Sequence, residues 1–438
     1  MKAQLVPIYF KNSKNEEFDL QVSTLRGLLE DEAVILDAVE LGDEIPAADA
    51  VIFPVLIGEA YKQIDKIMKI ELPIVALTSE FGTVAMWDWE IITYMKSKGL
   101  KPFAPYSIEL TKIICRTLAL KRELKDTKFL VFQDNPGDGM QAEIFKRFYW
   151  WEDECTRDIE ENFGVKIVKK SFKKLGEDAK AIADQEAEAA INNWDINCGC
   201  TSKKSLLSAA KIYVAIKREL DQDKSIRGVG INCLNESFYS DTTPCLAWNM
   251  LYEQEGIMWV CEGDTLSLLT KYIVNKALKT DIMMSNLYPF LMGMAALKHE
   301  KIDKFPDVNQ PENCILMAHC GYMGLSCQSQ SKSWEIVPKV LAIVDENAIA
   351  VNSTLPEGPI TLTKLHSTFK KLLIVDGQLE GYAQYPGSDC RNGAIIRVAD
   401  GHQIMDNLYS HHCCVINGNK AIELEIMSRV FELKTEKY

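Results

Sequence analysis

Short apolar runs alternate with amphipathic stretches along the first 130 residues. Residues 5–10, 50–56 and 73–77 are nearly continuous in hydrophobicity, whereas the intervening segments place apolar residues at helical spacing. Continuous apolar runs of this length are typical of parallel strands that helices cover on both faces. The pattern therefore predicts a doubly wound open sheet, which binds ligands at the carboxyl ends of its strands.

The same rhythm continues beyond residue 130. Apolar runs at 128–132, 229–233 and 257–261 predict strands, and the amphipathic stretches predict helices at 107–124, 177–192, 202–220, 244–252 and 265–277. A polar, glycine-bearing turn at 133–139 precedes what we expect to be a further long helix. We interpret the lysine-rich segment 166–174 as a solvated junction.

The pattern of apolar and polar residues changes after about residue 310. Short apolar runs separated by Pro and Gly turns predict antiparallel strands at 334–344, 349–352, 360–362, 371–375 and 394–398, and residues 421–433 predict a final helix. We therefore expect a mixed α/β protein, with two Rossmann-like doubly wound domains at 1–130 and 131–310. A C-terminal antiparallel, β-rich and barrel-like domain follows at 311–438.

Composition narrows the classes of function. The 438 residues carry a net charge of −13, which argues against a nucleic-acid backbone as partner and favours a small molecule. The longest apolar stretch, 287–297, is too short to span a bilayer, and the six-residue apolar run near the N-terminus is too short for a signal peptide. Thirteen cysteines in a chain of this length fit reduced thiols. We therefore expect a soluble, cytoplasmic protein.

Two carboxylates come directly after predicted strands. Glu236 follows the strand that ends at Cys233, and Asp264 follows the strand that ends at Cys261. In a parallel sheet both side chains can project into one crevice. At a separation of about 4 Å and an effective dielectric near 20, they would repel by roughly 4 kcal/mol, so the pair must share a proton or bind a cation. A divalent metal ion resolves this conflict.

A histidine pair offers the remaining ligand. The chain has six histidines, and two of them, His411 and His412, are adjacent. Two carboxylates, one imidazole from either residue and open positions suit Mn²⁺ or another divalent cation better than a closed structural zinc site. The alternative is that the carboxylates cap helices or pair with lysines.

Cysteine chemistry is a competing hypothesis. The possible thiolate ligands are Cys198, Cys200, Cys314, Cys320, Cys327, Cys413 and Cys414, and none of them has Cys-x-x-Cys spacing. The neighbouring pairs His319–Cys320 and His412–Cys413 could suggest a nucleophile with its base. Adjacent residues of a strand, however, face opposite sides of it.

Three blocks resemble the L-fucose isomerase and L-arabinose isomerase superfamily, in particular its shorter fucose-isomerase-like branch. They are residues 244–264 with the motif Cys-Glu-Gly-Asp at 261–264 and Asn-Glu at 235–236 upstream, the motif Gly-Pro-Ile-Thr-Leu-Thr at 358–363, and the pair His411–His412 followed by Gly418. The resemblance covers most of residues 130–435. The segment around Glu236 departs from the family pattern, which leaves the substrate open.

The resemblance implies a metal-dependent aldose–ketose isomerase that acts through an ene-diol. It assigns Mn²⁺ to Glu236, Asp264 and His412, with the two carboxylates transferring the proton at C2.

The resemblance also implies residues that contact the substrate and an oligomeric assembly. Substrate contacts are expected from Arg391, His319, His411 and Trp87. A homo-oligomer, trimeric or hexameric, is expected, in which a neighbouring subunit helps to close the pocket. Two alternatives stay open: a sugar-binding relative without turnover, and a metal-dependent lyase or aldolase that uses the same ene-diolate chemistry.

Overall fold

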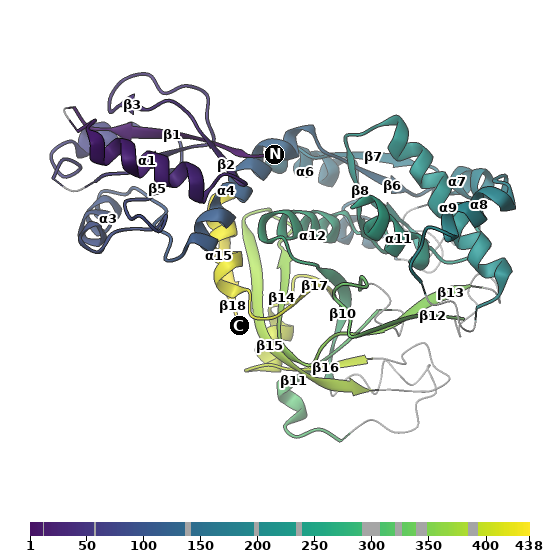
Figure 1. Ribbon diagram of the computed structural model, residues 1–438. Coiled ribbons are helices and arrows are strands. Elements are labelled where there is room, and N and C mark those ends of the chain that lie inside the picture. Colours follow the sequence, from purple (N-terminus) through teal and green to yellow (C-terminus); the bar gives the residue numbers. More distant parts are fainter. Residues whose placement is uncertain are drawn as a thin grey trace. The chain divides into compact units, whose positions relative to one another are not determined.

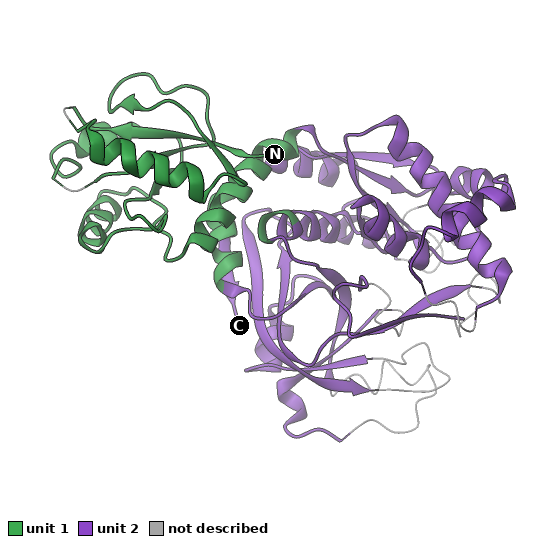
Figure 2. Cartoon of the chain, in the orientation of Figure 1, with its two compact units in different colours: residues 1–125, 276–278, 422–432 green, residues 126–275, 279–421, 433–438 purple. Residues whose placement is uncertain are grey.

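The chain forms two compact units, shown in Figure 2. Unit 1 comprises residues 1–125, 276–278 and 422–432, and unit 2 comprises 126–275, 279–421 and 433–438. A computed structural model describes all residues except 12, 57, 136–141, 197–200, 234–238, 291–306, 320–325, 339–347 and 384–392. The expected combination of parallel α/β sheets with an antiparallel barrel toward the C-terminus is confirmed (Figure 1). The division into three domains stays a prediction.

Unit 1 contains a five-stranded parallel sheet. Its strand order is β2-β1-β4-β5, with β3 pairing to β1. Its elements are β1 (Ala3–Tyr9), α1 (Glu16–Leu28), β2 (Ala33–Ile35), β3 (Val39–Glu40), β4 (Ala50–Phe53), α2 (Ile64–Ile67), β5 (Ile74–Ala76), η1 (Met86–Asp88), α3 (Trp89–Ser97) and α4 (Ile108–Glu123), together with most of α15 (Ala421–Val430). Strand β4 is buried at every position, as its continuous apolar sequence requires.

A second parallel sheet lies in unit 2, with strand order β7-β6-β8-β9. Its elements are β6 (Lys128–Phe132), α5 (Phe145–Phe148), α6 (Asp153–Phe163), β7 (Lys166–Lys170), α7 (Phe172–Lys180), α8 (Asp184–Ile191), α9 (Lys203–Gln222), β8 (Ile226–Ile231), α11 (Cys245–Glu255), β9 (Met258–Val260) and α12 (Thr265–Leu278), with η2 (Leu124–Asp126) leading in. The lysines of the segment 166–174 are largely exposed, as expected, and its first residues form the edge strand β7. Lysines on an edge strand discourage pairing with another chain.

Two helical expectations are wrong. The long helix expected after residue 139 reduces, within the described residues, to the single turn of α5, because the backbone reverses at Trp150 with φ of 60°. The helix expected at 177–192 is divided between α7 and α8. The reversal at Trp150 matters for the site, because Trp151 Nε1 then donates to the carbonyl oxygen of Gly263 at 2.7 Å.

The C-terminal part of unit 2 is a closed antiparallel barrel of six strands, in the order β14-β17-β10-β11-β16-β15 with β15 pairing back to β14. Its elements are β10 (Met283–Pro289), η4 (Pro311–Asn313), β11 (Cys314–Ala318), β14 (Gly358–Leu365), β15 (Lys371–Ala383), β16 (Gly393–Arg397), α14 (Gly401–Asp406) and β17 (His412–Asn417). Strands β12 (Ser333–Pro338) and β13 (Ile349–Thr354) form a separate hairpin, and β18 (Lys434–Lys437) extends β15 in parallel.

Helix α12 links the sheet to the barrel (Figure 1). On the sheet side, the buried Lys271 donates to the carbonyl oxygen of Trp259 at 2.7 Å. On the barrel side, the backbone N–H of Leu365 donates to Thr270 Oγ1 at 3.2 Å. Because both contacts are buried, the central turn of α12 is fixed between the two layers.

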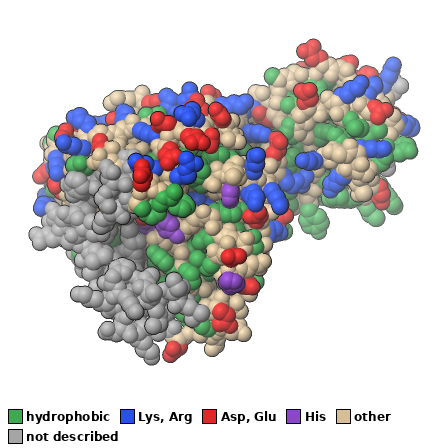
Figure 3. All heavy atoms as spheres, turned by 180° about the vertical axis from the view of Figure 1, so that it is seen from behind, with side chains coloured by type: hydrophobic (Ala, Val, Ile, Leu, Met, Phe, Trp, Pro, Cys, Tyr) green, Lys and Arg blue, Asp and Glu red, His purple; other side chains and the backbone are tan. Residues whose placement is uncertain are grey.

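The surface shows no block of one charge on the face drawn in Figure 3, where Lys and Arg side chains are interspersed with Asp and Glu among the described residues. Across the described surface, many charged side chains form exposed ion pairs, such as Arg218 with Glu186 at 2.7 Å. In the part of the chain that the structure describes, no helix combines the length and the apolar sequence needed to cross a bilayer.

Gly401 in α14 and Gly27 in α1 allow a paired test of the packing beside β11. A Cβ at Gly401 would collide with the carbonyl oxygen of Glu312, whereas a Cβ at Gly27 in α1 would meet nothing within 4 Å. We expect Gly401→Ala to lower the stability of unit 2 by roughly 1–3 kcal/mol, because a backbone group must shift. Gly27→Ala should stabilise unit 1 by about 0.5–1 kcal/mol through helix propensity. Calorimetric unfolding measures both stability changes. Changes of the same sign in the two variants would contradict the packing described for Gly401.

Candidate metal centre

A tight turn between β9 and α12 builds one side of the site. The turn has the sequence Cys261-Glu262-Gly263-Asp264, and both Glu262 and Gly263 adopt the left-handed region, with φ of 57° and 66°. Glycine is suited to that conformation, whereas a glutamate that adopts it must be held there by its contacts. The turn lies at the carboxyl edge of the parallel sheet, where open α/β sheets bind ligands.

Asp264 is held entirely by protein groups. As the N-cap of α12 it accepts from the backbone N–H of Ser267 at 2.8 Å and from Ser267 Oγ at 2.7 Å. The Nζ of Lys364 lies 3.1 Å from its Oδ2, and Nδ1 of His412 lies 2.8 Å from the same oxygen. Asp264, Lys364 and His412 are each at most 1% exposed.

Glu262 lies beside Asp264 with its carboxylate turned to other partners. Tyr149 Oη donates to its Oε2 at 2.7 Å, and Nε2 of His412 lies 3.4 Å from the same oxygen. On the other side, Nε2 of His319 lies 3.6 Å from Oε1. The Tyr149 ring also stacks on the His412 ring, with centroids 5.2 Å apart and planes at 11°. Glu262 is thus surrounded by donors and is itself buried.

The barrel supplies the histidines. His412 is the first residue of β17 and pairs with Asn286 of β10, while His319 directly follows β11. His411 lies next to His412, with ring centroids 4.3 Å apart, and is the exposed member of the pair. The end of the barrel therefore brings imidazoles to the sheet edge that carries Glu262.

Glu262, His411 and His412 form a group that could hold a metal ion, because their ligand atoms lie within 4.8 Å of one another. The contacts of His412 fit this use. Its Nδ1 faces Asp264, while Nε2 is buried and forms no hydrogen bond within the described residues. A metal-binding histidine usually bonds a carboxylate through its other ring nitrogen, which fixes the orientation of the ring.

The buried charges compensate one another. Although burial alone would lower it, the charges of Glu262 and Asp264 raise the pKa of His412 to about 9 in the metal-free protein, so a cation at Nε2 would have to displace a proton. Burial opposes the shift at Glu262 as well, yet the charge of His412 lowers the pKa of that carboxyl to about 2. Although His411 is the more exposed of the two histidines, desolvation by the groups packed around its ring and the charge of His412 lower its pKa to about 4, so His411 is neutral at pH 7 and has a lone pair for a cation.

The residues that the sequence singled out are distributed as follows. Asp264 and His412 are in direct contact, and His411 and His319 lie beside them, with His319 centred 5.5 Å from the His412 ring. Trp87 belongs to unit 1, where it is 68% exposed, and its contact with substrate stays a prediction.

Other expected site residues lie outside the described residues. These are Glu236, Arg391 and the competing thiolates Cys198, Cys200 and Cys320, together with most of the glycine-bearing turn after residue 133. Their roles stay predictions.

Glu262 and Lys364 were not singled out by the sequence analysis. Glu262 stands two residues before Asp264 in the same strand-end turn, and the glycine after it is a signal for a left-handed backbone. That signal could have marked Glu262 as a second carboxylate at this edge. No comparable signal existed for Lys364, which lies inside an apolar strand.

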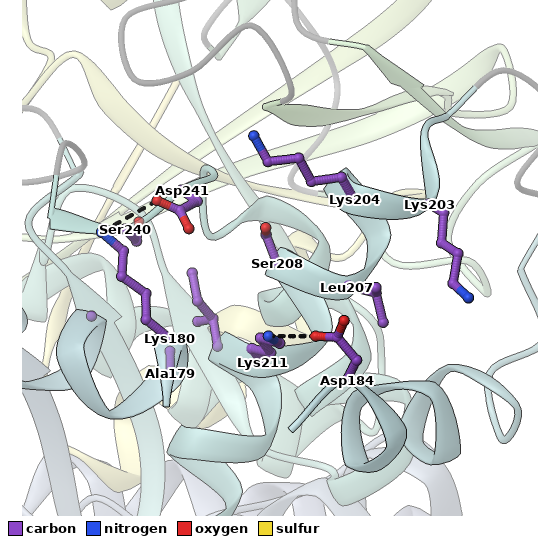
Figure 4. Close-up of a pocket in the computed structure, with 12 residues that line it drawn as sticks. Ala179, Lys180, Asp184, Lys203, Lys204, Leu207, Ser208, Lys211, Ser240 and Asp241 are labelled. Atoms are coloured by element: carbon purple, nitrogen blue, oxygen red, sulfur yellow. Dashed lines mark ion pairs between the residues drawn. The ribbon is translucent and has the colours of Figure 1, made fainter. Parts of the chain in front are cut away.

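A separate pocket of about 440 Å³ lies between α7 and α9 (Figure 4). It is lined by four lysines, of which Lys180 pairs with Asp241 at 3.2 Å and Lys211 pairs with Asp184 at 2.7 Å. Since two of the four lysines have an acidic partner at the pocket wall, the pocket does not stand out as strongly basic. It contains none of the residues of the metal centre.

Comparisons with known proteins add no assignment. The sequence matches no protein-family model, and it shows no significant similarity to a curated protein.

The charge pairing at His412 predicts a pH dependence of stability for the metal-free protein. Because the pKa is raised from 6.5 to about 9 by folding, the stabilisation is complete below pH 6.5 and is lost as the pH rises through about 9. Relative to His412→Gln, the wild type should lose on the order of 1–3 kcal/mol across this window. Denaturant unfolding at several pH values measures the difference.

The exposed His402, on α14, provides the control for this experiment. His402→Gln should keep the wild-type pH dependence because its side chain is outside the buried cluster. A His412→Gln variant with an unchanged pH profile would show that the pairing contributes nothing to folding.

Proposed function

We propose that the protein is a metal-dependent aldose–ketose isomerase that acts on an open-chain sugar through an ene-diol, similar to the L-fucose and L-arabinose isomerases. The observation that carries the proposal is the Glu262–His411–His412 group at the carboxyl edge of a parallel sheet, with Asp264 behind His412. The resemblance in the blocks around residues 261–264, 358–363 and 411–418 supports the same assignment. In this proposal the two parallel sheets act as Rossmann-like, doubly wound layers.

Mn²⁺ or a related dication is the proposed cofactor, held by Glu262, His411 and His412. A carboxylate oxygen with two imidazoles suits a borderline cation that keeps open positions for substrate oxygens. When bound, such an ion supplies Lewis acidity that stabilises negative charge on a sugar oxygen. Glu236, which the resemblance also assigns to the ion, belongs to the same proposal.

The protein's own groups prepare this site. Asp264 holds the His412 ring through Nδ1, so that Nε2 keeps one direction. Tyr149 donates to Glu262, and burial together with the Glu262 charge raises the pKa of the phenol well above its ordinary value, so it stays a donor. Lys364 neutralises Asp264 inside the protein, which lowers the cost of burying that carboxylate.

Proton transfer at C2 needs a carboxylate that is not committed to the protein. Asp264 already accepts four contacts, so its proposed part is to orient His412 rather than to take the substrate proton. We assign the transfer to Glu236, the other of the two carboxylates to which the resemblance gives this role. A homo-oligomer in which Trp87 helps to close the pocket is the corresponding proposal for assembly.

The isomerase assignment predicts a specific reaction. Purified protein with Mn²⁺ should convert an aldose from a panel of pentoses, hexoses and deoxysugars to its ketose, and should exchange the C2 proton with deuterium from solvent. EDTA should abolish turnover. Glu236→Gln should lower kcat at least about 100-fold, because positioned proton transfer contributes about 10²–10⁴-fold.

His402→Ala serves as the matched control and should leave kcat unchanged. Products of carbon–carbon bond cleavage would favour the lyase or aldolase alternative over the isomerase. Sugar binding without product or deuterium exchange would favour the relative without turnover.

The orienting role of Tyr149 makes a second prediction. Tyr149→Phe removes one hydrogen bond to Glu262 and keeps the stacked ring, so we expect metal affinity to fall by about 10–100-fold. Titration with Co²⁺, followed by visible absorption, measures the affinity. Tyr213→Phe is the matched control, because Tyr213 is also buried and donates to a glutamate, Glu255, at 2.8 Å. Equal Co²⁺ affinities for the two variants would show that Tyr149 does not contribute to the metal site.

A further inference from the structure

Two thiols meet beside the candidate metal centre. Cys233 lies two residues beyond the end of β8, and Cys261 directly follows β9. Their sulfur atoms are 3.3 Å apart, which is a contact distance rather than the roughly 2.05 Å of a disulfide bond. A change of about 1.3 Å in the sulfur separation would join them.

The backbone around the pair permits this approach. Strands β8 and β9 are hydrogen-bonded neighbours in parallel register, with Gly230 opposite Val260. Because Gly230 has no side chain, the turn between β9 and α12 packs closely onto β8. A Cβ built at Gly230 would lie 3.3 Å from the Cα of Gly263 in that turn. The two cysteines therefore leave adjacent strands at one sheet edge with little between them.

The exposures of the two thiols differ. Cys233 is partly exposed, whereas Cys261 is 3% exposed. The adjacent pair Cys413 and Cys414 is different, since both are buried and their thiols bond to separate acceptors, the carbonyl oxygens of Thr363 and Ser267. A small reagent in solution can reach Cys233 first.

We propose that Cys233 and Cys261 are a thiol–disulfide pair that couples redox state to the metal centre. The oxidant is a small-molecule disulfide. The Cys233 thiolate attacks one sulfur of that disulfide, which releases one small thiol and leaves a mixed disulfide on Cys233. The Cys261 thiolate then attacks the Cys233 sulfur and releases the second small thiol. Each protein thiol loses its proton and one electron, and the reagent gains both electrons.

The consequence for the centre follows from the chain path. Cys261 is bonded directly to Glu262, whose backbone is already in the left-handed region at φ of 57°. Pulling the Cys261 sulfur toward Cys233 turns the same peptide that aims the Glu262 carboxylate at His412. The oxidised protein should therefore bind a cation more weakly. This coupling rests on the proposed metal site, while formation of the disulfide does not.

The first measurement tests the disulfide alone. The full-length reduced protein is incubated with glutathione disulfide, and its intact mass and peptide map are recorded. We expect loss of two hydrogen atoms, about 2 Da, with residues 233 and 261 in one cross-linked peptide. Cys233→Ser and Cys261→Ser should not form that cross-link, while Cys245→Ser, which removes another partly exposed cysteine, should form it as the wild type does. A peptide map without this cross-link would overturn the proposal.

The second measurement tests the coupling. Co²⁺ affinity should fall at least tenfold on oxidation of the wild type and of Cys245→Ser, recover with dithiothreitol, and stay constant in Cys233→Ser. A disulfide that forms without changing Co²⁺ affinity would overturn the coupling. Absence of sugar isomerisation, by contrast, would reject the proposed function and leave the mass and Co²⁺ results in force.

Discussion

A single buried carboxylate, that of Asp264, joins the two layers of unit 2. Its partners come from α12, from β14 through Lys364 and from β17 through His412. An unpaired charge at full burial is so costly that all of these elements must be in place before the group can remain ionised. The partners also hold the pKa of Asp264 well below its ordinary value, in spite of the opposing effect of burial. The position of the His412 ring thus follows from an electrostatic requirement of the fold.

This requirement separates the tasks of two neighbouring acids. Asp264 is occupied by the protein, so it fixes geometry, whereas Glu262 faces the imidazoles and has the freedom to act as a ligand. The difference arises from two left-handed residues in the turn, which point successive carboxylates in different directions. A four-residue segment is enough to supply both an anchor and a candidate ligand.

Much of the fold could be predicted from sequence, for a physical reason. A strand buried on both faces must be apolar throughout, and the expected strand at 128–132 coincides with β6. Barrel strands β10 and β11 were not predicted, although the Asn- and Pro-containing segment 307–313 is a turn signal directly before β11. The helix expected beyond residue 139 failed at Trp150, where contacts with the distant Gly263 carbonyl region decide the backbone.

The candidate site was predictable in location and less so in detail. The rule that ligands bind beyond strand ends pointed to the turn at Asp264, and the scarcity of histidines pointed to residues 411 and 412. Which carboxylate turns toward the imidazoles depends on the φ angles of Glu262 and Gly263, and a residue pattern does not encode these angles. The buried Lys364 was hidden for a similar reason, since a lysine in an apolar strand carries no mark of its partner.

The path of the chain between the units has a consequence for biosynthesis. Helix α15 belongs to unit 1, and its Val430 packs in the core formed by residues of the first 120 positions. During translation, a ribosome must therefore add some 300 further residues before that core can be closed. Until then the N-terminal sheet lacks the contacts of Val430 and Ile426, while α1 and α4 already cover the same face.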